Sequence, residues 1–207
     1  DPIFSVTMPR RGTVGCGMDA LTHAIESYVT PLANPFSDAQ AIGAWIYGYR
    51  ALPICANEPD NLQARGDMLA ASCLAGISFS NCALGICHGV AHTFGATYGI
   101  PHGLANAVAL PYSIDFNANH DSHARKRYEE LATFVGKNDL KKTIIDLRRQ
   151  LDVPATMKEL VPDEGTFNTD FDTLVQKVLT DVATPANPVK ITEEYASEML
   201  RRVYYGE

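Results

Sequence analysis

The sequence predicts an all-α fold, a bundle of helices with no sheet. Apolar residues recur at three- and four-residue spacing through most of the chain, which is the helical period. Only residues 3–6 are expected to form a short strand. No strand is followed by a glycine-rich turn and a helix, so the sequence lacks a phosphate-binding loop of the Rossmann or P-loop kind. Without repeats or a linker, residues 1–207 are expected to form a single helical domain.

Prolines and glycines divide the first part of the chain. Two prolines and three glycines fall within residues 1–17, so this segment is expected to be extended or looped. Ser37 and Asp38 are candidates to cap the second helix, and Pro53 is expected to end it. The polar loop ANEPDN separates the second helix from the third. The helices expected in this part span residues 18–30, 39–52 and 62–84.

The stretch GICHGVAHTFGATYGIPHGLANAVALP, residues 85–111, is expected to form two helices joined by a sharp turn. Gly99 and Pro101 lie in that turn and interrupt the helical pattern. Pro111 and the asparagines after it are expected to close the second of these helices. A turn-rich connection over residues 153–165 carries a short helix near Met157. The helices expected in this part span residues 84–98, a segment from 102 onward, 123–134, 140–151, 168–182 and 191–205.

The composition argues against several functional classes. With 17 basic and 24 acidic residues the formal charge is −7, whereas a nucleic-acid surface needs clustered Lys and Arg. No apolar run approaches the roughly 20 residues of a membrane span. The five cysteines form no CxxC pair, which is typical of reduced thiols inside the cell. We therefore expect a cytoplasmic protein that binds neither nucleic acid nor membrane.

Five residues at helical spacing form a candidate metal site. Asp19 and His23 lie four residues apart on one helix, and His88 and His92 lie four apart on another. His102 begins the helix that follows the turn. One carboxylate with several imidazoles suits Zn²⁺ or Fe²⁺ rather than Mg²⁺ or Ca²⁺. The alternatives are that Asp19 caps its helix and that individual histidines only pack in the core.

Other polar residues near these motifs have simpler interpretations. Glu26 shares a helical stripe with His23, so it either orients a metal ligand or forms a salt bridge or faces solvent. Cys87 adjoins a candidate ligand but is expected to be a buried core thiol. His120 and His123 lie in a polar segment and are expected at the surface.

The motif GMDALTHAIESYV, followed by the histidine stretch quoted above, resembles the iron-containing (group III) alcohol dehydrogenases. The segments DPIFSVTMP, NPFSDAQA and ATPANPVKIT fit as well, so the resemblance covers nearly the whole chain. It is to the C-terminal, metal-binding helical domain of that dehydroquinate synthase-like fold. The resemblance implies that His92 lies near the nicotinamide and the substrate and acts in catalysis. The metal ligands that it implies are Asp19, His23, His88 and His102.

The resemblance also implies a reaction. A divalent ion, Fe²⁺ in most of the family and Zn²⁺ in some relatives, would polarise a small alcohol or aldehyde while a hydride passes to or from NAD or NADP. The family holds the nucleotide mainly in an N-terminal α/β domain, which this chain lacks. We therefore expect a fragment that binds metal but has little dehydrogenase activity alone. A substrate pocket near Phe94, Thr97 and Tyr98 and a homodimer are further expectations from the resemblance.

Two other functions remain open from the residues alone. A metal-dependent hydrolase or lyase would need no nucleotide, although no HExxH pairing supplies a general base. A metal-stabilised, non-catalytic helical domain is the second alternative. Assays of the metal-loaded chain with and without nucleotide separate the first from a dehydrogenase. Replacement of His92 by Ala separates the second, because a purely structural site would not need that residue.

Overall fold

The computed structural model describes residues 1–161 and 163–206, and every α-helix in that part was expected from the sequence in type and order. The described residues contain no strand, so the all-α prediction is confirmed. Pro162, in the predicted connection, and Glu207 lie outside the described residues. The α-helices are α1 (Arg10–Val29), α2 (Pro35–Asn57), α3 (Leu62–Cys82), α4 (Ile86–Tyr98), α5 (His102–His120), α6 (Ser122–Phe134), α7 (Leu140–Gln150), α8 (Glu164–Thr180) and α9 (Glu193–Tyr205). The 3₁₀ helices are η1 (Pro2–Ser5), η2 (Met157–Glu159) and η3 (Thr184–Ala186).

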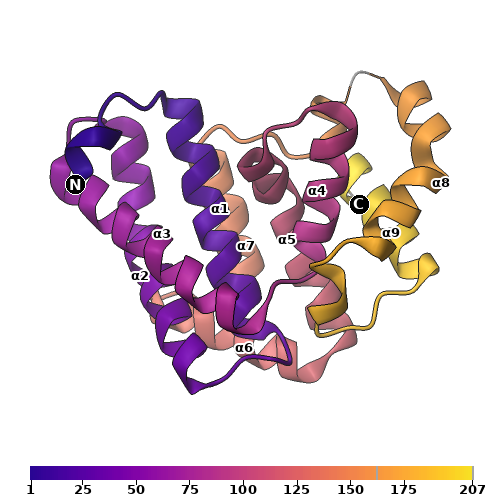
Figure 1. Cartoon of the computed structure of the whole chain (residues 1–207), viewed down its shortest axis with the longest axis horizontal. Coiled ribbons are helices and arrows are strands. Elements are labelled where there is room, and N and C mark those ends of the chain that lie inside the picture. The colour runs from indigo at the N-terminus through magenta and orange to yellow at the C-terminus, as the bar shows by residue number, and fades with distance from the viewer. Residues whose placement is uncertain (162, 207) are drawn as a thin grey trace.

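The helices form two groups that share α5 (Figure 1). Helices α1, α2 and α3 pack on one another at one end of the molecule, and α8 packs on α9 at the other. Helix α5 contacts α1, α4, α6, α7 and α9, so it lies at the centre of the fold. Trp45 on α2 is fully buried, and its indole N–H donates to the carbonyl oxygen of Leu131 on α6 at 2.8 Å. This bond satisfies the polar atom of the largest core side chain.

The N-terminal segment differs from its prediction. Residues 2–5 form η1 rather than a strand, because Pro2 begins the helix and the Asp1 carboxylate accepts the Ile3 N–H at 3.0 Å. Helix α1 begins at Arg10 and not near residue 18, despite its glycines. A Cβ at Gly17 would lie 2.3 Å from a methyl carbon of Leu52 on α2. Close helix packing therefore explains a glycine that local propensity assigns to a loop.

Two helices continue through prolines that were expected to end them. Helix α2 contains Pro53 and runs on to Asn57, and α5 contains Pro111 and runs on to His120. A proline inside a helix loses one backbone hydrogen bond. Burial of the flanking side chains offsets that loss, since Leu52 beside Pro53 and Leu110 beside Pro111 are almost fully buried. The expectation that Pro53 ends α2 was therefore wrong, whereas α5 ends at His120, directly after the asparagines that were expected to close it together with Pro111.

The remaining boundaries lie close to the predicted ones. Asn34 caps α2 by accepting the N–H of Ser37 at 3.1 Å, and the Ser37 hydroxyl accepts the Asn34 N–H in return. The cap thus lies three residues before the predicted one. Gly99 ends α4 with φ +70°, a left-handed conformation that favours glycine. Helix α8 begins four residues earlier than predicted, because Asp163 caps it.

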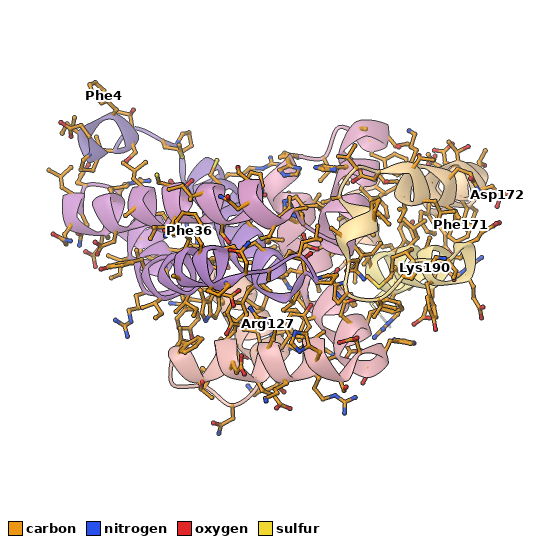
Figure 2. The ribbon with its side chains drawn as sticks, turned by 60° about the horizontal axis from the view of Figure 1, so that its bottom comes forward. Phe4, Phe36, Arg127, Phe171, Asp172 and Lys190 are labelled. Carbon is orange, nitrogen blue, oxygen red and sulfur yellow. The ribbon has the colours of Figure 1, made fainter. Side chains whose placement is uncertain are left out.

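The surface carries both ion pairs and exposed apolar side chains (Figure 2). Arg127 on α6 contacts the Asp38 carboxylate on α2 at 2.5 Å and donates to the carbonyl oxygen of Tyr28 on α1. Phe4 on η1 projects from the molecule and is 85% exposed. Within residues 1–161 and 163–206, no single helix is both long and apolar enough to cross a bilayer. Helices α3 and α4 reach that length and hydropathy only as a pair, bent by 106°.

Candidate metal centre

Helix α1 supplies the first two residues of the candidate site. Asp19 and His23 lie one turn apart on its inner face, with a carboxylate oxygen of Asp19 3.8 Å from Nδ1 of His23. Their side chains are 21% and 18% exposed. The four-residue spacing explains this, because positions i and i+4 of a helix project from the same face.

Helices α4 and α5 bring two histidines to the same carboxylate. Nε2 of His102 lies 3.1 Å from Oδ1 of Asp19, and Nε2 of His88 lies 3.6 Å from that oxygen. His88 is buried, whereas the side chain of His102 is 42% exposed. The turn between α4 and α5 is what returns His102 towards His88, and their ring centroids lie 5.3 Å apart.

The structure brings together the four residues named from the sequence as metal ligands. Asp19, His23, His88 and His102 each offer one donor atom, and these atoms all lie within 4.8 Å of one another. Among the described residues, this is the group of His, Cys, Asp or Glu side chains whose donor atoms lie close enough together to hold one metal ion. Three imidazoles and one carboxylate form a donor set that suits Fe²⁺ or Zn²⁺. That they bind a metal stays a prediction.

One observation tests whether these residues fit a metal ion. Nε2 of His88 is buried and has no hydrogen-bond partner in the part of the chain that the structure describes. A buried nitrogen without a partner is costly. It faces the cluster, where His23 stacks on the His88 ring with centroids 4.6 Å apart. A divalent ion among the four donors would satisfy this nitrogen, so the residues present fit the ion.

Burial and the neighbouring carboxylates and imidazoles shift the pKa values of the residues in the metal-free cluster. Burial opposes ionisation of Asp19, but the surrounding His102 and His88 rings outweigh it and hold the pKa of this carboxyl well below its usual range. Burial and the neighbouring His88 lower the pKa of His23 to about 4. Burial also opposes the charged form of His88, yet the carboxylates of Asp19 and Glu26 raise its pKa to about 9.

His92 lies beside the four candidate ligands and has a partner of its own. Its ring stacks on His102 with centroids 5.1 Å apart, and Nδ1 lies 2.9 Å from the carboxylate of Asp181. Asp181 directly follows α8 and was not identified from the sequence. The His92 side chain is 37% exposed. It borders a pocket of about 330 Å³, lined by His92, Thr93, Ala96, Lys177, Thr180, Asp181 and Val182.

None of Phe94, Thr97 and Tyr98 lines this pocket, although Thr93 and Ala96, which do line it, adjoin Phe94 and Thr97 on α4. Phe94 is fully buried, so it belongs to the core rather than to a pocket wall. Thr97 accepts a hydrogen bond from Lys177 at 2.8 Å, and Tyr98 donates to Asp170 at 3.1 Å. The correction follows from helical spacing. Ala96 lies four residues after His92 on the same face of α4, while Phe94 points away from it.

Three residues around the cluster carry contacts that the sequence left open or missed. Glu26 was named as a possible orienting residue, and its carboxylate lies 2.5 Å from Nδ1 of His88. Asn106 was missed; it donates to Oδ1 of Asp19 at 2.8 Å. Its position four residues after His102 was the available signal. Phe79 on α3 was also missed and stacks on His23 with centroids 4.5 Å apart.

The remaining cysteine and histidine predictions agree with the structure. Cys87 is fully buried, and burial raises the pKa of its thiol well above the usual value. It is therefore a core residue rather than a nucleophile. His120 and His123 are exposed, at the end of α5 and the beginning of α6.

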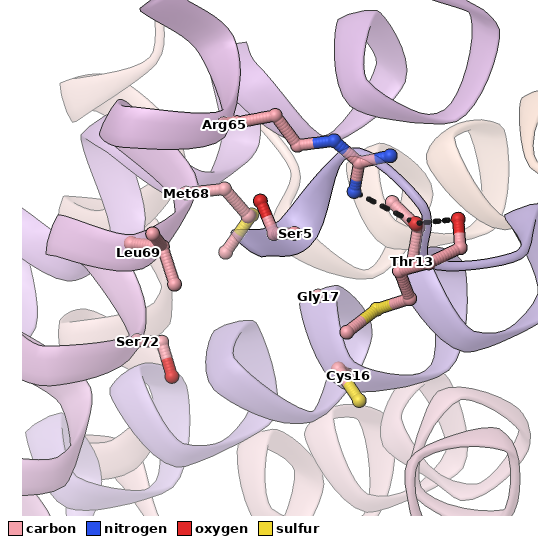
Figure 3. Close-up of a pocket in the computed structure, with 9 residues that line it drawn as sticks. Ser5, Thr13, Cys16, Gly17, Arg65, Met68, Leu69 and Ser72 are labelled. Atoms are coloured by element: carbon pink, nitrogen blue, oxygen red, sulfur yellow. Dashed lines mark hydrogen bonds between the residues drawn. The ribbon is translucent and has the colours of Figure 1, made fainter. Parts of the chain in front are cut away.

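A separate pocket lies between η1, α1 and α3 (Figure 3). Its volume is about 220 Å³, and none of the residues that line it belongs to the histidine cluster. Arg65 on α3 donates to Thr13 on α1 at 2.9 Å and to the carbonyl oxygen of Pro59 at 3.0 Å. These bonds tie the beginning of α3 to the beginning of α1, which gives Arg65 a structural role.

The chain is similar to known proteins over its whole length. A model of the Fe-containing alcohol dehydrogenase family, C-terminal, matches residues 13–204. An NADPH-dependent butanol dehydrogenase of Clostridium saccharobutylicum is 36% identical over 100% of this chain and 54% of its own length. An alcohol dehydrogenase of Thermococcus barophilus is 38% identical over 99% of this chain and 53% of its own.

A solved structure shows the same fold. An iron-containing alcohol dehydrogenase from Thermococcus thioreducens superposes with a TM-score of 0.93 and 39% identity, covering 100% of this chain and 54% of that one. The chain thus spans about half the length of the relatives it matches. This confirms the resemblance inferred from the two histidine motifs. The chain belongs to the Fe-containing alcohol dehydrogenase family, and it corresponds to the C-terminal part of the family's members.

Proposed function

We propose that this chain is the metal-binding half of a dehydrogenase that interconverts a small alcohol and an aldehyde or ketone, with hydride transfer to or from NAD or NADP. The observation that carries the proposal is the convergence of Asp19, His23, His88 and His102 within 4.8 Å. Membership of the family supports this reaction class. Fe²⁺ is the proposed ion, and Zn²⁺ has the same donor preferences.

A divalent ion held by these four residues supplies a Lewis acid, which favours loss of the hydroxyl proton from an alcohol and polarises the carbonyl in the reverse direction. The chain's own part is to hold and orient. The side-chain nitrogen of Asn106 donates to Asp19 and lies 3.1 Å from Nε2 of His102, so it fixes the positions of these two candidate ligands relative to each other. Phe79 and His88 hold the His23 ring between them, which limits its rotation.

His92 is the proposed proton-transfer residue. Its Nδ1 donates to Asp181, so Nε2 is the ring nitrogen that can take up or release a proton. A carboxylate in this position also fixes the ring orientation. His92 lies between the cluster and the pocket lined by Lys177 and Val182. We assign it transfer of the hydroxyl proton and contact with the nicotinamide.

The nucleotide requires a second part of the protein. The described helices provide no glycine-rich strand–turn–helix to hold a pyrophosphate. The relatives are about twice as long as this chain, and we propose that the N-terminal half of the full-length protein binds NAD or NADP. That half would cover the exposed side of the cluster, where His102 and His92 are 42% and 37% exposed.

The test measures metal content and hydride transfer separately. Purified chain is loaded anaerobically with Fe²⁺, and elemental analysis is expected to find roughly one ion per chain. Less than roughly a tenth of an ion per chain would contradict the site. The chain is then joined to the N-terminal half of the Thermococcus barophilus relative, and aldehyde reduction by NADH and NADPH is followed.

Two comparisons complete the test. The chimera is expected to reduce aldehydes, whereas robust reduction by the chain alone would overturn the proposed division between the halves. In the chimera, His92→Ala is expected to keep the metal and to lower turnover by about 10²–10⁴-fold. Asp181→Asn is expected to lower turnover less, because His92 is still present but less well oriented. Unchanged turnover in His92→Ala would contradict the assigned role.

A further inference from the structure

Glu26 is a buried carboxylate directly behind the candidate ligand His88. Its side chain is only 4% exposed, and Oε2 lies 2.5 Å from Nδ1 of His88. Oε1 accepts the backbone N–H of Cys87 at 2.8 Å. The carboxylate is thus held at the N-terminus of α4, where the backbone N–H groups and the helix dipole favour negative charge.

The chain leaves space for this carboxylate at Gly85. A Cβ on Gly85 would lie 2.9 Å from Oε1 of Glu26 and 2.9 Å from Oδ1 of Asn187. Asn187 accepts the N–H of Ile86 at 3.1 Å through that oxygen. Two side chains from distant parts of the chain therefore cap α4 in place of a local cap, and the missing side chain at residue 85 admits both.

The two ring nitrogens of His88 have different surroundings. Nδ1 donates to Glu26, while Nε2 points towards Asp19, 3.6 Å from its carboxylate, and has no hydrogen-bond partner within the described residues. A carboxylate at Nδ1 favours the tautomer that carries its hydrogen there. In the neutral ring that metal binding requires, the lone pair of Nε2 is directed at the cluster.

Helix α1 carries both this carboxylate and two of the candidate ligands. Asp19, His23 and Glu26 occupy positions i, i+4 and i+7, so they lie along one face. One rigid helix thus sets the distance between two donor atoms and the residue that orients a third. If the carboxylate that orients His88 came from another loop or helix, its position would not be fixed relative to Asp19 and His23.

We propose that Glu26 is a positioning residue of the metal centre, which fixes the tautomer and orientation of His88 without donating an atom to the ion. This inference rests on the proposed metal-binding function. It predicts that the metal affinity depends on the carboxylate of Glu26 as well as on the four donors. An outer partner of this kind contributes about 10–100-fold to metal affinity.

The experiment compares Co²⁺ affinity, by titration of the purified protein, in wild type, Glu26→Gln and Glu26→Asp. In Glu26→Gln the amide N–H₂ opposite Nδ1 favours the other tautomer, so affinity is expected to fall about 10–100-fold. Glu26→Asp keeps an acceptor and is expected to recover part of that loss. The matched control is Glu130→Gln on α6. It weakens the hydrogen bond that Tyr28 on α1 donates to Glu130, and it should leave the Co²⁺ affinity unchanged.

Two further measurements distinguish an effect of Glu26 on His88 from a loss of folding or of the metal site. Thermal unfolding without metal shows whether each variant folds. Nitrogen-15 NMR of the Zn²⁺-loaded wild type reads the His88 tautomer directly, with Nδ1 expected to carry hydrogen and Nε2 to bind the ion. Coordination through Nδ1, or a folded Glu26→Gln protein with wild-type affinity, would overturn the role of Glu26 alone. Failure of the wild type to bind Co²⁺ or Zn²⁺ would overturn the metal site and this role together.

Discussion

The carbonyl oxygen of Gly15 on α1 lies 2.1 Å from the position that a Cβ on Gly103 of α5 would occupy. The two helices can cross this closely only because residue 103 has no side chain. Gly103 directly follows His102, and Gly15 lies one turn before Asp19. The close crossing therefore allows Nε2 of His102 to reach within 3.1 Å of the Asp19 carboxylate.

The first prediction concerns this crossing. In Gly103→Ala the new methyl group meets backbone atoms, which cannot rotate away, so the helices must separate. The free energy of unfolding is expected to fall by about 1–3 kcal/mol, and Co²⁺ affinity should fall with it. Denaturant unfolding measures the former. Gly76→Ala on α3 is the control, because its Cβ would meet nothing within 4 Å and should stabilise the helix by about 0.5–1 kcal/mol. Equal stability of the two variants would contradict the packing argument.

The second prediction concerns stabilisation by metal. An ion that binds the four converged residues of the folded state raises the free energy of unfolding by about 2.7 kcal/mol at a hundred times its Kd. Thermal unfolding with Zn²⁺, or with Fe²⁺ under anaerobic conditions, is expected to show a higher Tm, and a chelator should reverse it. In Asp19→Asn the shift should disappear. The same shift in this variant would place the bound ion elsewhere.

The third prediction separates two histidines whose rings stack on each other. His92→Ala should bind Co²⁺ with nearly the wild-type affinity, because His92 donates to Asp181 rather than to the cluster. His102→Ala should lose at least the 10–100-fold that loss of an outer partner costs, since it removes a proposed donor. Titration of both variants with Co²⁺ measures this difference. A larger loss in His92→Ala than in His102→Ala would exchange the two roles.

The fourth prediction concerns stability at low pH. Asp115 on α5 forms ion pairs with Lys141 on α7 and with Arg202 on α9. Burial opposes its ionisation, but these two cations outweigh burial and hold the pKa of the carboxyl below its usual value. Because the pKa is lower in the folded state, Asp115 contributes stability above its unfolded pKa of about 3.9, and this contribution is lost as the pH falls through the folded pKa.

Asp115→Asn is therefore expected to lower the free energy of unfolding at pH 7 by about 1–2 kcal/mol. The difference from wild type should shrink as the pH falls below about 3.9. Urea unfolding at a series of pH values measures both. Asp146→Asn, which removes an exposed pair with Lys142 on α7, should change stability little. A constant difference down to acidic pH would show that Asp115 acts through packing rather than through charge.

Much of the helical architecture could be predicted because it depends on local rules. The amphipathic pattern located α6 and α7 within a residue or two of their observed ends, and the turn at Gly99 follows from its left-handed conformation. The prediction that Pro53 ends α2 was wrong, and α5 continues through Pro111 as far as the asparagines that were expected to close it. Local propensity ends a helix at a proline, but the buried Leu52 and Leu110 beside these prolines favour continuation of the two helices.

The sequence by itself determined that the chain is helical and which side chains could hold a metal, because four-residue spacing places Asp19 beside His23 wherever the helix packs. Only the tertiary structure decided the partners of these residues. Glu26 reaches His88 across 62 residues, and Asp181 reaches His92 across 89. Such contacts depend on how helices cross, on a missing side chain at Gly103 and on burial. No local pattern encodes them, since the groups that meet are set by packing between elements far apart in the chain.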